Sequence, residues 1–256
     1  MGSELTARGV DTSLPLWSAQ ALVADGTTVA AIHHEYVTLG CTHHRTNTFR
    51  TRRGNVGEEW AELARRAVKL AKLSVTDKHT LLGSLGPVED CYRPDRSPGE
   101  ESRVSHRELA SLLVAEGVDV LLCEAFPSPL EALIAVEECV RTDRETWVAF
   151  TAGPDGDLMT PKAMREAARD CIRAGADAVL VNCVSAEKTL PYVDALAGLG
   201  VLVGAYGNAA AWNGPKVGAE RYAELAATWM EAGAEIIGAC CGTGPEYVDA
   251  LRRRLL

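Results

Sequence analysis

The stretch Ala174-Gly-Ala-Asp-Ala-Val-Leu-Val-Asn-Cys183 contains the end of one structural element and the whole of the next. Gly175 suits the left-handed conformation that ends a helix, and the apolar run that follows it is typical of a buried strand. The same type of joint recurs at 116–119, 199–201 and 232–235. A chain that repeats helix, glycine and apolar strand predicts a parallel sheet covered by helices.

Short β-branched segments alternate with longer amphipathic segments along the chain. The expected strands lie near 41–46, 79–85, 118–123, 146–151, 177–183, 200–206 and 235–240. The expected helices lie near 17–39 (in two pieces), 57–73, 102–116, 128–141, 160–174, 187–198, 218–232 and 245–255. The simplest architecture is an α/β fold of the (β/α)8 TIM-barrel type, formed as a single domain over residues 1–256.

The strand pattern is one short of a closed barrel, because this architecture needs eight strands and seven are recognisable. The pattern predicts that the first strand is missing or truncated, or that residues 1–5 are its remnant. An incomplete barrel would expose unpaired strand edges, which favour aggregation and weak turnover. We expect that an upstream segment, a short apolar strand ending in Asp-Gly, would raise stability and activity.

The composition narrows the class of protein. Hydrophobic residues make up 47% of the 256 residues and charged residues 24%, so a large core is expected. A net charge of −9 argues against nucleic acid or an anionic membrane surface as a partner. The sequence shows no membrane-spanning run and no signal peptide, and its eight cysteines do not form a disulfide pattern. The cytoplasm is the expected compartment, and the oligomeric state is left open.

Three cysteines follow apolar strands and are the best candidates for a metal site. Cys183 ends the segment quoted above, and Cys240 and Cys241 end the run Glu235-Ile-Ile-Gly-Ala. Adjacent cysteines do not bridge each other without strain, but two neighbouring thiolates can bind one soft metal ion. Three thiolates on one zinc leave a fourth position open, as in catalytic sites. The alternative is three buried free cysteines.

Other polar residues also follow the expected strands, and active sites of this fold lie at that end of the sheet. The two histidine pairs, 33–34 and 43–44, are weaker metal candidates because their members are adjacent in sequence. The remaining cysteines are expected to be core or surface thiols. The polar residues at strand ends are Asn47, Thr48, Ser84, Glu124, Thr151 and Asn208.

Several motifs in order resemble the zinc-dependent homocysteine S-methyltransferase family. They are Thr-Asn-Thr-Phe-Arg-Thr (46–51), Ser-Leu-Gly-Pro (84–87), Cys-Glu-Ala-Phe-Pro-Ser (123–128), Val-Asn-Cys (181–183) and Gly-Ala-Cys-Cys-Gly-Thr-Gly-Pro (238–245). The opening Met-Gly-Ser-Glu-Leu resembles the family's first motif, entered partway through. The family's aromatic-Pro-Asn segment is represented here by Tyr206-Gly-Asn208, without its proline.

The resemblance implies a zinc ion held by Cys183, Cys240 and Cys241, and methyl transfer to the thiolate of homocysteine, giving methionine. It implies that Glu124 binds the amino group of homocysteine. We expect the amides of Gly242, Thr243 and Gly244 to bind its carboxylate, as helix starts bind anions. The remaining expected substrate contacts are Asn47, Thr48, Ser84, Asn182, Tyr206 and Asn208.

The methyl donor is not identified by the sequence. The length leaves no room for a folate or cobalamin module, which favours S-methylmethionine, S-adenosylmethionine or a betaine. Tyr206, Trp212 or Trp17 could contact such a cation through a ring face, although packing is the simpler role, especially for Trp17. Three alternatives stay open: a zinc-binding barrel without transferase activity, a methyltransferase for another thiol or selenol, and a barrel lyase without a metal.

Overall fold

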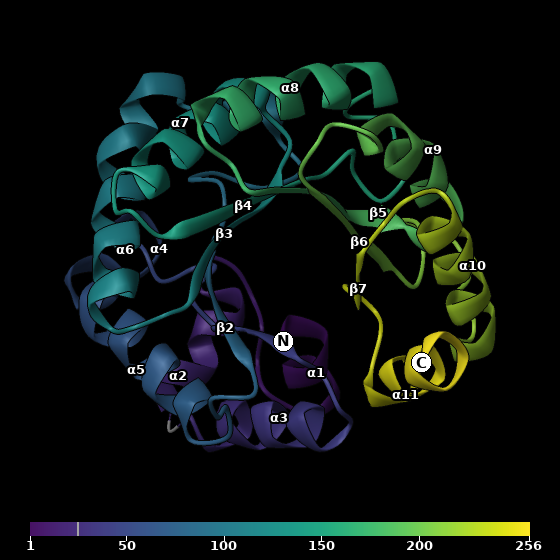
Figure 1. The fold of residues 1–256 in the computed structure, drawn as a ribbon. Helices are drawn as coiled ribbons and strands as arrows, with labels where there is room; N and C mark the ends of the chain where they lie inside the picture. The colour runs from purple at the N-terminus through teal and green to yellow at the C-terminus, as the bar shows by residue number, and fades with distance from the viewer. Residues whose placement is uncertain (25) are drawn as a thin grey trace.

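The computed structural model describes residues 1–24 and 26–256. Its strands are β1 (His43–Arg45), β2 (Thr80–Leu85), β3 (Val120–Phe126), β4 (Glu145–Phe150), β5 (Ala178–Ser185), β6 (Leu202–Asn208) and β7 (Ile236–Ala239). They form one parallel sheet in the order β1 to β7. The sheet curls, and helices surround it on its outer side (Figure 1). The sheet therefore has the curvature of a TIM-type barrel, with seven strands among the described residues.

The helices alternate with the strands as expected. The α-helices are α1 (Gly2–Ala7), α2 (Gln20–Ala24), α3 (Thr27–Thr38), α4 (Arg53–Val56), α5 (Trp60–Lys72), α6 (Arg103–Ala115), α7 (Pro129–Val140), α8 (Pro161–Ala174), α9 (Ala186–Leu196), α10 (Ala219–Glu231) and α11 (Pro245–Leu255). Short 3₁₀ helices are η1 (Trp17–Ala19), η2 (Gly57–Glu59), η3 (Pro94–Arg96) and η4 (Gly99–Ser102). The part of the expected 17–39 helix that covers residue 25 lies outside the described residues.

The hypothesis that residues 1–5 are the remnant of a strand is wrong. These residues begin α1, and Leu5 on this helix is fully buried. Leu5 packs with Leu22, Val29 and Leu63 in a small core cluster between the N-terminal helices and α5. A six-residue helix with one large buried side chain has too little periodicity to be told from a short strand by sequence pattern.

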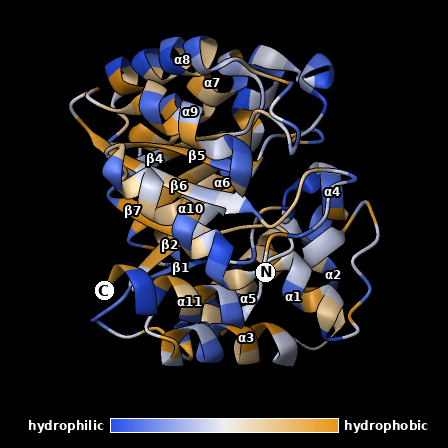
Figure 2. Ribbon diagram, turned by 90° about the vertical axis from the view of Figure 1, so that its right-hand side faces the viewer, coloured by the Kyte–Doolittle hydropathy of each residue, from blue (hydrophilic) through white to orange (hydrophobic). Residues whose placement is uncertain are grey.

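Two apolar layers hold the sheet in place. The larger lies between the strands and the outer helices and includes Phe126, Phe150 and Trp229. The smaller lies on the inner face of the curl and includes Trp147 and Tyr206. In Figure 2 the strands are mostly coloured hydrophobic, whereas the surrounding helices carry both colours. This pattern is expected for strands buried on both faces.

The joint at Gly175 behaves as the sequence predicts, whereas α9 ends at Leu196, before the joint at 199–201. Gly175 has φ 111° and caps the C-terminus of α8, and Asp177 then donates its backbone N–H to the carbonyl of Thr146 on the neighbouring strand. The parallel arrangement brings all strand C-termini to one end of the sheet, where the candidate site lies. No helix of the described chain is both long and apolar enough to span a bilayer.

Candidate active site

Three thiols meet at the C-terminal end of the sheet. Cys183 lies near the end of β5, and Cys240 and Cys241 follow β7 directly. The Sγ atoms of Cys183 and Cys240 are 3.1 Å apart, those of Cys240 and Cys241 are 4.0 Å apart, and all three lie within 4.8 Å of one another. Two sulfurs bound tetrahedrally to one zinc lie about 3.8 Å apart, so the set fits a single ion.

The thiols are free and share a proton network. Hydrogen bonds from Cys183 and Cys241 hold the pKa of Cys240 well below its usual range. The pKa of Cys183 is raised well above its ordinary value, first because it donates to Cys240 and Cys241 and then because it is buried. Metals bind the thiolate form of cysteine, so a cation held by these three residues would displace their thiol protons.

A β-bulge directs Cys183 to the site. The pairing of β5 with β6 shifts register between Asn182 and Ser185, and Cys183 has φ 55°, an unusual value for a residue with a side chain. Asn208 at the end of β6 supports this conformation by donating from Nδ2 to the carbonyl of Cys183, at 3.0 Å. Its Oδ1 accepts the backbone N–H of Cys241, at 3.1 Å. Asn208 therefore joins the two halves of the cysteine cluster.

A second bulge directs Glu124 toward the same space. Here β3 shifts register against β4 between Cys123 and Phe126, and Ala125 has φ 61°. The backbone N–H of Ala125 donates to Oδ1 of Asn182, at 3.2 Å, and Nδ2 of Asn182 lies 3.4 Å from Sγ of Cys183. One asparagine thus connects the two bulges.

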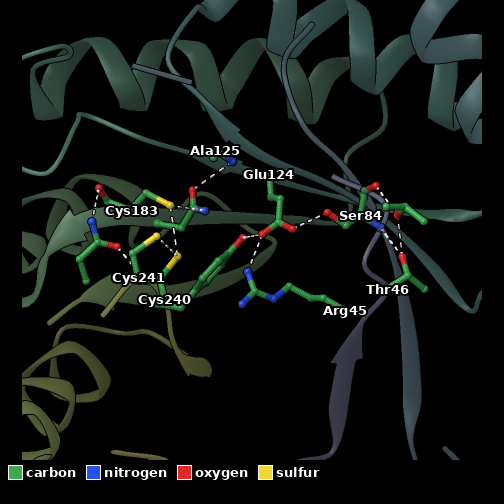
Figure 3. A network of polar contacts seen from close by, with 12 residues as sticks. Arg45, Thr46, Ser84, Glu124, Ala125, Cys183, Cys240 and Cys241 are labelled. Atoms are coloured by element: carbon green, nitrogen blue, oxygen red, sulfur yellow. Dashed lines mark hydrogen bonds and ion pairs between the residues drawn. The ribbon is translucent and has the colours of Figure 1, made fainter. Parts of the chain in front are cut away.

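Glu124 is the centre of a polar network that faces the cysteines, as Figure 3 shows. Its Oε1 accepts from the hydroxyl of Ser84 at 2.5 Å. Its Oε2 accepts from Nη1 of Arg45 at 2.6 Å and from the hydroxyl of Tyr206 at 3.2 Å. Burial alone would lower the pKa of Arg45, but Glu124 and the cysteine cluster raise it well above its ordinary value. The arginine therefore stays charged.

Arg45 is the functional candidate that the sequence analysis missed. Its guanidinium lies over the ring of Tyr206, 4.9 Å from the ring centroid. This face of Tyr206 is therefore already paired with a cation, so the ring is a poorer candidate for contact with a methyl donor. The sequence feature that could have revealed Arg45 is a charged residue inside an expected strand, immediately before the 46–51 motif.

The cysteines, Glu124 and Arg45 line one cavity of about 920 Å³. A volume of this size suits small-molecule ligands. Most of the expected substrate residues also line it: Asn47, Ser84, Asn182, Tyr206, Asn208, Gly242 and Thr243. Trp212 and Tyr92 pack edge to face at 5.0 Å, and both line the cavity. Trp17 packs against Phe49.

Two of the expected contacts hold the loop after β1 in place. Asn47 donates from Nδ2 to the carbonyl of Ser18, at 2.8 Å, although it also borders the cavity. Thr48 is fully buried and donates to the carbonyl of Ser84, at 2.7 Å. It is not among the described residues that line the cavity. Thr48 thus positions Ser84, which in turn contacts Glu124.

The loop after β7 is held by hydrogen bonds within itself and to α1. The backbone N–H of Gly242 donates to Oγ of Ser3, at 2.9 Å, and that of Thr243 to the carbonyl of Cys240, at 3.4 Å. The hydroxyl of Thr243 also donates to the Cys240 carbonyl, at 2.5 Å. Two of the three amides expected to bind a carboxylate therefore already have acceptors, and Gly244 is not among the described residues that line the cavity.

The histidine pairs are not part of this cluster, although His33, His43 and His44 border the same cavity. His33 and His44 are buried, whereas His34 and His43 are exposed. Among the described residues, the metal-binding type of cluster is formed by Cys183, Cys240 and Cys241 alone. The remaining cysteines are free, and those at 123, 139 and 171 are buried in the core, as expected.

Comparisons with known proteins agree with this geometry. A homocysteine S-methyltransferase of Escherichia coli (strain K12) is 28% identical over 99% of this chain and 93% of its own. The homocysteine S-methyltransferase YbgG of Bacillus subtilis (strain 168) is 27% identical over 98% and 91%. The metallated crystal form of the homocysteine methyltransferase MmuM from E. coli superposes with a TM-score of 0.84 at 25% identity, covering 99% of this chain and 93% of that one. Its oxidized form gives 0.82 at 26% identity.

The family model described as homocysteine S-methyltransferase matches residues 1–255. The match spans both bulges, the Glu124 network and the cysteine cluster. The chain therefore belongs to the homocysteine S-methyltransferase family.

Proposed function

We propose that this protein transfers a methyl group from a small activated donor to the thiolate of homocysteine, giving methionine. The observation that carries the proposal is the cysteine cluster on the wall of the same cavity as the buried carboxylate of Glu124. The first supplies ligands for a metal, and the second a partner for a substrate ammonium. We further propose that the reaction belongs to one domain, residues 1–256, and to the cytoplasm, where thiols stay reduced.

The donor set supports zinc as the metal in this proposal. Sulfur ligands select zinc over magnesium or calcium, and three ligands leave one position for a substrate. Zinc bound by Cys183, Cys240 and Cys241 would lower the pKa of the acceptor thiol, so that the acceptor is a thiolate at neutral pH. Asn208 and Asn182 then orient the cluster, as the outer contacts of metal ligands do.

The protein's other residues orient the acceptor. Glu124 pairs with the acceptor's ammonium, and the hydroxyls of Ser84 and Tyr206 hold the carboxylate of Glu124 in place. Fixing the thiolate against the donor makes the reaction effectively intramolecular. The sulfur forms a bond to the methyl carbon as the bond from that carbon to the donor's onium atom breaks. The electron pair of the broken bond stays with the donor, which leaves as a neutral group.

Three donors fit this chemistry: S-methylmethionine, S-adenosylmethionine and a betaine. Each carries a methyl group on a positive sulfur or nitrogen. Trp212 remains the better aromatic candidate for contact with such a cation, because it lines the cavity and is 60% exposed. A relative from Pongo abelii, 25% identical over 94% of this chain, bears the name S-methylmethionine--homocysteine S-methyltransferase. S-Methylmethionine is therefore the first donor to test.

The test combines metal analysis with a methylation assay. The purified protein should hold one zinc per chain and convert homocysteine to methionine with one of the three donors. Cys240→Ala should abolish tight zinc binding and activity, because it removes the ligand central to the cluster. Cys171→Ala is the matched control, since this buried cysteine lies on α8 away from the cavity. Full zinc occupancy in a variant lacking all three site cysteines would refute the assignment.

A further inference from the structure

The Glu124–Arg45 ion pair places two opposite charges on the wall of the cavity. Glu124 is 6% exposed, whereas the side chain of Arg45 is 30% exposed and borders the cavity. A guanidinium has five N–H donors. Among the described residues, Arg45 has one acceptor, Oε2 of Glu124. The arginine therefore has donors left for a ligand.

The geometry keeps Arg45 in one orientation. Tyr206 supports the guanidinium from one face, and Glu124 fixes one of its edges. A planar fork held in this way is suited to a carboxylate, which it can bind through two parallel hydrogen bonds. An anion here also compensates a positive charge whose counter-ion, Glu124, is shared with the hydroxyls of Ser84 and Tyr206.

The other candidate for a carboxylate site is weaker. The backbone amides of Gly242 and Thr243 donate to Ser3 and to the carbonyl of Cys240. A carboxylate would have to break these bonds before it could use the amides. Arg45 can accept the same ligand without losing its bond to Glu124.

We propose that Arg45 is a specificity-determining residue that binds the carboxylate of the acceptor thiol. This inference rests on the proposed function and names a contact within the same site. Glu124 then binds the ammonium and Arg45 the carboxylate, so the ion pair recognises a zwitterionic amino acid. The cysteine cluster lines the same cavity (Figure 3) and takes the thiol of the same molecule.

Three ligands distinguish the contribution of the carboxylate from that of the amino group in an equilibrium binding experiment. Homocysteine carries both groups, homocysteamine lacks the carboxylate, and γ-mercaptobutyrate lacks the amine. Dissociation constants are measured by calorimetry on the zinc-loaded protein without a methyl donor. The wild-type protein should bind homocysteine at least about tenfold more tightly than homocysteamine, the factor expected for one charge-assisted hydrogen bond.

The variants assign this factor to Arg45. Arg45→Gln should bind homocysteine and homocysteamine within about threefold of each other, while keeping its preference for homocysteine over γ-mercaptobutyrate. Arg45→Lys should keep part of the discrimination, because the charge remains but the fork is lost. Arg252→Gln is the control, since this exposed arginine also borders the cavity but on α11.

The outcomes distinguish this inference from the proposed function. If wild-type protein binds homocysteamine as tightly as homocysteine, the assignment of Arg45 is wrong, whether or not methyl transfer occurs. An Arg45→Gln variant that keeps the full tenfold discrimination overturns it as well. If no thiol is methylated but the binding pattern is as expected, the proposed function fails and the carboxylate site stands. If Arg45→Gln does not fold, the inference is decided by the relative affinities for homocysteine and homocysteamine in the wild-type protein and in Arg45→Lys.

Discussion

Replacing Asn208 by alanine tests whether the structure around the cysteines sets their metal affinity. Asn208 is not one of the expected zinc ligands, but it is 3% exposed and bonded to both halves of the cluster. Asn208→Ala removes the 3.0 Å bond to the Cys183 carbonyl and the 3.1 Å bond from the Cys241 amide. It also removes the support for the positive φ of Cys183.

The expected magnitude follows from these two bonds. Each contributes about 0.5–1.5 kcal/mol net, and a buried group left without a partner costs about 1–3 kcal/mol. We therefore expect the metal-free protein to lose about 2–4 kcal/mol of unfolding free energy. The zinc affinity should fall about 10- to 100-fold, as it does when groups that orient metal ligands are removed.

Competition with a chromophoric chelator measures the zinc affinity, and urea unfolding of the metal-free protein measures the stability. Asn213→Ala is the matched control, because Asn213 lies in the β6–α10 connection that follows Asn208 but is exposed. A zinc affinity for Asn208→Ala within about threefold of the wild-type value would refute the reasoning. A loss of the same size in Asn213→Ala would refute it too.

Three further predictions concern substrate recognition, packing and pH. Glu124→Gln should leave zinc binding unchanged and lower kcat/KM for homocysteine about tenfold or more; unchanged kinetics would exclude an ammonium contact. Gly204→Ala should destabilise the protein by about 1–3 kcal/mol in urea unfolding, because its Cβ would overlap Leu180. Burial lowers the pKa of His33 from 6.5 to about 3, so the neutral ring stabilises the fold above pH 6.5 and this contribution is lost as pH falls toward 3. His33→Leu should flatten the acid-side loss of unfolding free energy, and an unchanged pH profile would contradict this.

The sequence predicted the strand positions well because the relevant signals are local. Every observed strand overlaps an expected segment, since apolar runs and glycine joints are properties of neighbouring residues. Three strands extend beyond their expected ends, β3 to Phe126, β5 to Ser185 and β6 to Asn208. The extensions of β3 and β5 begin where the register shifts at a bulge. A bulge depends on the partner strand, so the sequence of one strand alone does not reveal it.

The site residues that the sequence predicted are those with a local sequence pattern, and the contacts that it missed involve partners far away in the chain. The cysteine pair and the Val-Asn-Cys segment have recognisable spacing, and the structure brings these thiols together. Arg45 was missed because its partner Glu124 is 79 residues away and no local pattern connects them. The bonds that occupy the amides of Gly242 and Thr243 were missed too, because one acceptor, Ser3, lies 239 residues away.

The two bulges explain why this end of the sheet can support chemistry. In a regular strand the side chains alternate between the two faces, so consecutive residues cannot serve one site. The bulge at Ala125 turns the chain directly after Glu124, and the bulge at Cys183 does so directly after Asn182. Asn182 contacts both the Ala125 amide and the Cys183 thiol. The distance between the Glu124 carboxylate and the cysteine cluster is therefore set by strand ends that are hydrogen-bonded to each other. An acceptor that binds Glu124 through its ammonium and the cluster through its thiol must match this fixed distance.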